Sequence, residues 1–154
     1  MGTNTTELDA TAYHESGHVI ALRHVKRRAL AVSVTSEKAG YTLPDKIPED
    51  PDQVALVGLA GIQAESLQPY SLDDLDAAIR AYVAAASDRN QIAKAFDQVW
   101  LSRNALWHQA KYDKALKFVQ EHQTEINALA TAILKIAGFP KTLNEAEIET
   151  ALKR

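Results

Sequence analysis

Two histidines stand four residues apart in the segment ATAYHESGHVIALRHV, residues 10–25, and only a helix makes that spacing useful. Residues four apart lie on one face of a helix, so the imidazoles of His14 and His18 can bind one metal ion together. Glu15 projects to the side of this pair, where it can reach a water on the metal without being a ligand. The pattern indicates either a zinc hydrolase or an ordinary helix with a polar flank, and in both cases a helix over about residues 9–25.

Most of the remaining chain also has a helical pattern. Periodic apolar positions and capping residues predict helices over residues 52–67, 72–86, 88–101 and 104–137, and a last helix capped by Asn144 and Glu147. In the 52–67 helix, four small residues form a smooth flank on which another helix can pack closely: Gly58, Ala60, Gly61 and Ala64.

One stretch has the pattern of a strand instead. ALAVSVTS, residues 29–36, alternates its side chains with a period of two, and Tyr41-Thr42-Leu43 follows after a turn as a short partner strand. No repeat, low-complexity tract or linker divides the chain. The sequence therefore predicts one domain, residues 1–154, that is mainly α with a small two-stranded β-hairpin.

Composition narrows the function classes. The 154 residues include no cysteine, so a metal would be held by nitrogen and oxygen atoms. The net charge of −3 disfavours a nucleic-acid partner. The longest uncharged apolar run, residues 54–62, is about half of a membrane span, and the N-terminus lacks the features of a signal peptide. We therefore expect a soluble cytoplasmic protein without membrane insertion.

The third ligand decides which kind of metal site the histidines form, and the residues alone leave it open. His24 falls on the last position of the metzincin pattern, but Ala21 replaces the glycine that breaks the helix there, and the only methionine is Met1. Glu65 could complete the site from a later helix, or could support it as a carboxylate outside the metal. Asp88 lies among alanines, where a carboxylate is costly unless a cation faces it. His108 and His122 fit partly packed positions better than ligand positions.

Taken together, these residues resemble the peptidase domain of FtsH-type AAA+ metallopeptidases. AYHESGHV at 12–19 is similar to the zinc helix of that family. Further similar segments follow in the family's order: Ser33-Val34-Thr35, Gly40-Tyr41-Thr42, LAGIQAES at 59–66, Ala86-Ser87-Asp88 and the closing KTLNEAEIETAL.

The resemblance implies a helical, zincin-like peptidase domain that binds Zn²⁺ through His14, His18 and Asp88. It implies that Glu15 is the catalytic base and that Glu65 supports the site. It also places the strand around Val32 to Thr35 as an edge near the cleft, to which an extended peptide could add by main-chain hydrogen bonds. The expected substrate-binding residues are Val32, Ser33, Val34, Thr35, Gly40 and Tyr41.

The chain departs from the family in lacking both a GxxxxGK[ST] loop and membrane helices. We therefore expect an ATP-independent zinc endopeptidase that acts on peptides or unfolded proteins, with a homo-oligomer or a separate partner protein left open. The alternative is a non-catalytic zinc-binding regulatory or interaction module of the same fold, and a third reading is a regulator that cleaves one dedicated partner.

Overall fold

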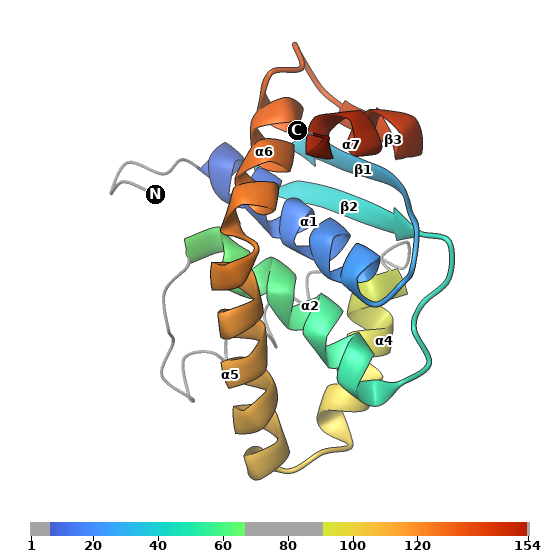
Figure 1. Ribbon diagram of the computed structural model, residues 1–154, viewed down its shortest axis with the longest axis vertical. Helices are drawn as coiled ribbons and strands as arrows, with labels where there is room; N and C mark the ends of the chain where they lie inside the picture. The colour runs from blue at the N-terminus through green and yellow to red at the C-terminus, as the bar shows by residue number, and fades with distance from the viewer. Residues whose placement is uncertain (1–6, 67–90, 154) are drawn as a thin grey trace.

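The computed structural model describes residues 7–66 and 91–153, which form helices around a small sheet (Figure 1). The described helices are α1 (Glu7–His24), α2 (Pro51–Ser66), α4 (Gln91–Leu101), α5 (Ala105–Glu121), α6 (Gln123–Leu134) and α7 (Glu145–Leu152). The strands are β1 (Ala29–Ser36), β2 (Ala39–Pro44) and β3 (Lys141–Asn144). The mainly α class is confirmed, whereas the helix expected over residues 72–86 lies outside the described residues.

The sheet corrects the sequence prediction. It has three strands rather than two, in the order β2-β1-β3, and both pairings are antiparallel. Val32, Ser33 and Val34 of β1 pair with Leu143, Thr142 and Lys141 of β3. A strand of four residues directly before a helix cap carries almost no periodicity, so the sequence pattern did not distinguish it from a loop.

The third strand changes the place of β1. Because β1 is paired on both sides, the prediction that it is an edge strand is wrong. Within the described sheet β2 and β3 are the outer strands, and β2 lies against α1, as β1 does (Figure 1).

The long helix expected over residues 104–137 is divided at His122. This residue leaves the helical conformation with φ −109° and ψ 18°, ending α5, and α6 starts at Gln123. The Nδ1 atom of His122 lies 2.8 Å from the Phe118 carbonyl oxygen, so the side chain competes for a helix acceptor at the break. In contrast, the reciprocal capping box between Asn144 and Glu147 at the start of α7 is confirmed.

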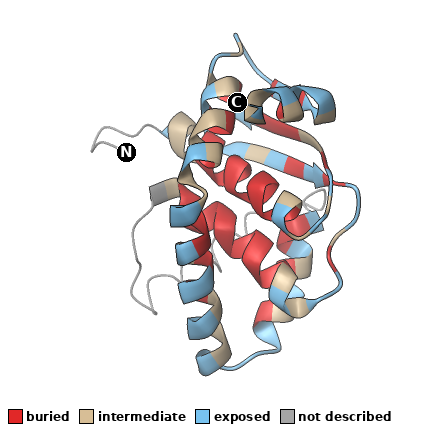
Figure 2. Cartoon of the chain, in the orientation of Figure 1, coloured by how far each residue is buried: buried red, intermediate tan, exposed pale blue. Residues whose placement is uncertain are grey.

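The α1 helix is the centre of the core. Every residue from Ala12 to Leu22 is buried, because α1 packs against α2, α6 and the sheet (Figure 2). Ala60, Gly61 and Ala64 of the smooth flank expected on α2 face α1, whereas Gly58 faces Phe96 of α4. The α1 contact is close: a Cβ atom on Gly17 would lie only 2.4 Å from the Ala60 carbonyl oxygen. Among the described helices, none has the length and apolarity to cross a membrane.

Candidate metal centre

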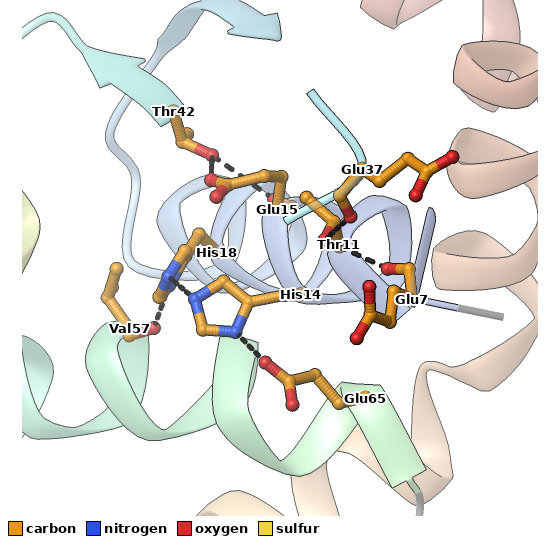
Figure 3. A network of polar contacts seen from close by, with 9 residues as sticks. All are labelled: Glu7, Thr11, His14, Glu15, His18, Glu37, Thr42, Val57 and Glu65. Atoms are coloured by element: carbon orange, nitrogen blue, oxygen red, sulfur yellow. Dashed lines mark hydrogen bonds and ion pairs between the residues drawn. The ribbon is translucent and has the colours of Figure 1, made fainter. Parts of the chain in front are cut away.

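His14 and His18 lie side by side in the buried contact between α1 and α2 (Figure 3). Only 4% of His14 and 1% of His18 is exposed. Their rings are nearly perpendicular, at 85°, and their Nε2 atoms are 3.0 Å apart. The helical spacing therefore brings the two Nε2 atoms within 3.0 Å of each other, on one face of α1.

The Nδ1 atom of each ring makes a polar contact with α2. His18 Nδ1 lies 2.7 Å from the Val57 carbonyl oxygen, and His14 Nδ1 lies 2.5 Å from Glu65 Oε1. A carbonyl oxygen can only accept, so His18 must donate from Nδ1, and an ionised Glu65 imposes the same role on His14. These bonds orient the two rings so that their Nε2 atoms face each other.

The protonation of the pair follows from its surroundings. Burial and the neighbouring His14 lower the pKa of His18 to about 3. Burial by itself would lower the pKa of His14 as well, but the hydrogen bond to Glu65 and the negative charges of Glu15 and Glu65 outweigh it, and the net direction is upward. These opposite pKa shifts favour a proton on His14 Nε2 over one on His18 Nε2 when no metal is bound. His18 Nε2 is then the acceptor of the hydrogen bond between the rings.

The surface of α2 is shaped to fit the His18 ring. A Cβ atom on Gly61 would lie 2.4 Å from His18 Cε1 and 2.6 Å from Nε2. These distances are far shorter than the ~3.5–4.0 Å of ordinary contacts between non-bonded atoms. A residue larger than glycine at position 61 is therefore incompatible with the observed position of the ring.

Glu15 points from α1 toward β2, whereas His14 and His18 point toward α2, as Figure 3 shows, and Glu15 is close enough to His14 for their charges to interact. Only 3% of the residue is exposed, and the Thr42 Oγ1 atom is 2.9 Å from its Oε1 atom. Burial raises the pKa of the Glu15 carboxyl, although His14 and the hydrogen bond from Thr42 act in the other direction. A carboxylate with a raised pKa is suited to accepting and returning a proton near neutral pH.

Glu65 contacts the ring nitrogen of His14 that points away from His18, so it is not positioned to bind the same metal ion as the two histidines. Its Oε1 atom is bonded to Nδ1, whereas the two rings converge through Nε2. This geometry fits the supporting role that the resemblance implies. Asp88, the other proposed third ligand, lies outside the described residues, and no group of three or more metal-binding side chains occurs within residues 7–66 and 91–153.

The other histidines serve packing. The α1 helix continues through Ala21 to His24, whose ring lies 5.0 Å from that of Phe118, so His24 does not turn back toward His14 and His18. His108 stacks on Trp100 with ring centroids 3.7 Å apart.

Of the expected substrate-binding residues, some are buried in the structure and others are accessible. Val32, Ser33 and Val34 are fully buried in the central strand, so their side chains cannot meet a peptide. Thr35 is exposed near the end of β1, and Gly40 and Tyr41 lie on β2, one of the two outer strands of the described sheet. Tyr41 is 37% exposed.

Three contacts of the site were not predicted from sequence. The carbonyl of Val57 carries no sequence signal, because every residue has one. Thr42 belongs to a segment noted for its resemblance, and Gly61 to the smooth flank, but neither was connected with a particular side chain. Only the packing of α2 and β2 against α1 identifies them.

Comparisons with known proteins do not assign the chain to a family. No family model matches the sequence, and no curated protein matches it.

Proposed function

We propose that this chain is a zinc-dependent peptide hydrolase in which His14 and His18 are metal ligands and Glu15 is the general base. The observation that carries the proposal is the convergence of the two buried Nε2 atoms at 3.0 Å while each Nδ1 atom is bonded elsewhere. An ordinary polar helix flank has no reason to bury two imidazoles and orient both in this way.

The donor set fits a zinc ion. Two nitrogen ligands of a tetrahedral zinc at about 2.0–2.1 Å lie about 3.3–3.4 Å apart, so the present 3.0 Å needs only a small opening of the pair. Metal-binding histidines almost always donate their other ring N–H to a carboxylate or a backbone carbonyl, and Glu65 and Val57 provide one of each. The third ligand that we propose is Asp88.

The zinc ion and Glu15 would have different roles in the reaction. A bound zinc ion would polarise the scissile carbonyl and lower the pKa of a water. Glu15 takes a proton from the attacking water and delivers it to the leaving amine. The buried position of Glu15 keeps bulk water from competing for that proton.

The substrate class follows from the sheet. An extended segment can add to the outer edge of β2, at Gly40 and Tyr41, by main-chain hydrogen bonds that select an extended shape more than a particular sequence. Because pairing with an edge strand requires an extended main chain, the substrates are flexible segments, peptides or proteins opened by a partner.

The test compares the wild-type protein with Glu15→Gln. Both are purified without added zinc, their bound metal is measured, and both are incubated with casein and an unstructured peptide. We expect one zinc per chain in both proteins and cleavage by the wild type only, because the variant keeps both histidines and loses the base. Equal cleavage by both proteins would contradict the role of Glu15, and a zinc-loaded wild type that cleaves nothing would support the non-catalytic binding module instead.

A further inference from the structure

The β2 strand reaches the general base of the proposed reaction directly. The Thr42 Oγ1 atom lies 2.9 Å from Glu15 Oε1 and 3.2 Å from the Glu15 backbone carbonyl oxygen. Only 5% of Thr42 and 3% of Glu15 is exposed, so water does not compete for this contact. Figure 3 shows the two side chains pointing toward one another across the gap between β2 and α1.

The Thr42 hydroxyl has one proton to donate, and the carboxylate is the better acceptor. It is closer than the carbonyl oxygen, and hydrogen bonds to an ionised group are about twice as strong as neutral ones. The contact therefore fixes the Oε1 atom of Glu15 relative to the strand.

The second carboxylate oxygen of Glu15, Oε2, lies next to the backbone of Gly40. A Cβ atom on Gly40 would lie 3.2 Å from Glu15 Oε2 and 3.0 Å from Glu15 Cγ. The absence of a side chain at position 40 leaves the space that the carboxylate occupies. One oxygen is held by a donor and the other fits against the strand, so β2 defines both the place and the rotation of the group.

We propose that Thr42 is a positioning residue, which, with the space left by Gly40, holds the Glu15 carboxylate in the orientation needed for proton transfer. This inference rests on the proposed function. The same strand carries the edge to which a substrate would add, with Tyr41 facing outward between Gly40 and Thr42. The segment 40–42 thus connects substrate docking on one side with the orientation of the base on the other.

The first test is kinetic and uses three variants. Thr42→Val removes the hydroxyl with little change of volume, and Thr42→Ser restores it. Thr142→Val is the control for loss of a threonine hydroxyl from the same sheet, at an exposed position. Thr142 lies in the same sheet and its hydroxyl contacts Ser33, 2.8 Å away, rather than Glu15.

We expect Thr42→Val to lower kcat by about tenfold to a hundredfold, because misplacing a reacting group by about 1 Å has an effect of this size. KM and the bound zinc should stay near the wild-type values, since the substrate edge and both histidines are unchanged. Thr42→Ser should recover most of the lost kcat, and Thr142→Val should match the wild type. A Thr42→Val enzyme with wild-type kcat would overturn the positioning role while leaving the proposed function intact.

The second test does not depend on catalysis or on metal. Urea unfolding of the metal-free wild type, Thr42→Val, Glu15→Ala and the double variant gives a double-mutant cycle. We expect the two changes to be coupled by about tenfold in the unfolding equilibrium constant, as for a hydrogen bond to a charged group. Additive effects would overturn the inference. If the zinc-loaded wild type cleaves nothing, the proposed function fails, and the cycle then decides alone whether Thr42 holds Glu15.

Discussion

Replacing Gly61 with alanine should abolish tight zinc binding without changing any ligand. The new Cβ atom would lie 2.4 Å from His18 Cε1 and 2.6 Å from His18 Nε2. Ordinary carbon contacts start at about 3.5 Å, so the ring must retreat by about 1 Å or α2 must move away from α1 by a similar distance.

The loss of affinity follows from that displacement. Metal–ligand distances tolerate changes of about 0.2 Å, and a shift near 1 Å is several times larger. The same shift breaks the 2.7 Å bond between His18 and the Val57 carbonyl, which orients the ring. Losing only a supporting partner weakens metal binding by about 10- to 100-fold, so displacing the ligand itself should weaken it by at least about 100-fold, or about 2.7 kcal/mol.

Gly58→Ala provides the matched control. Its Cβ atom would lie 2.5 Å from Phe96 Cδ1, an overlap of the same size on the same helix but away from both histidines. Each variant should lose about 1–3 kcal/mol of stability through overpacking and regain up to about 1 kcal/mol of helix propensity. Zinc affinity, measured by competition with a chromophoric chelator, should therefore fall for Gly61→Ala alone, while the urea midpoints of the two variants stay similar. If Gly61→Ala binds zinc as tightly as Gly58→Ala does, the proposed metal site is wrong.

Three further predictions concern the charges of the site. Glu65→Ala should weaken zinc binding about 10- to 100-fold in the same chelator competition, because His14 loses the acceptor for its Nδ1–H; an unchanged affinity would show that the contact does not support the metal. Zinc affinity should fall as the pH falls, by up to about tenfold per pH unit once His14 is protonated, because the raised pKa of His14 makes a proton compete with the cation; an affinity that is constant from about pH 8 to pH 5 would refute this. Metal-free Glu15→Gln should be more stable than metal-free wild type at neutral pH, because burial raises the pKa of Glu15. The stability that such an acid contributes is present at low pH and is lost as the pH rises through its folded pKa. The difference, followed by urea unfolding, should therefore narrow as the pH falls toward the ordinary carboxyl value of 4.5, and a gap that widens there would contradict the assignment.

Local sequence patterns were sufficient for much of the fold. The helix that carries His14 and His18, the hairpin of β1 and β2 and the capping box of Asn144 and Glu147 all occur where the sequence predicts them. Each depends on residues within a few positions of one another, through helical periodicity, strand alternation or a side chain that caps its own helix. The smooth flank of α2 was predicted on the same basis, because small side chains alone permit a close helix contact.

The division of the long helix at His122 was not predicted. A histidine within an amphipathic stretch is compatible with a continuous helix, and only its bond to the Phe118 carbonyl, together with the packing of α6 against α1, places the break there.

The sequence by itself determined that two imidazoles share one helical face with a carboxylate beside them, because the helix geometry requires it. Only the tertiary structure decided how those groups are oriented: Val57 lies 39 positions from His18, Glu65 lies 51 from His14, and Thr42 lies 27 from Glu15. The pairing of Ser33 with Thr142 across 109 positions likewise made β1 a central strand and β2 the outer strand beside the base. Contacts of this kind form when distant segments pack together, and a backbone carbonyl or a single hydroxyl carries no local pattern that announces its partner.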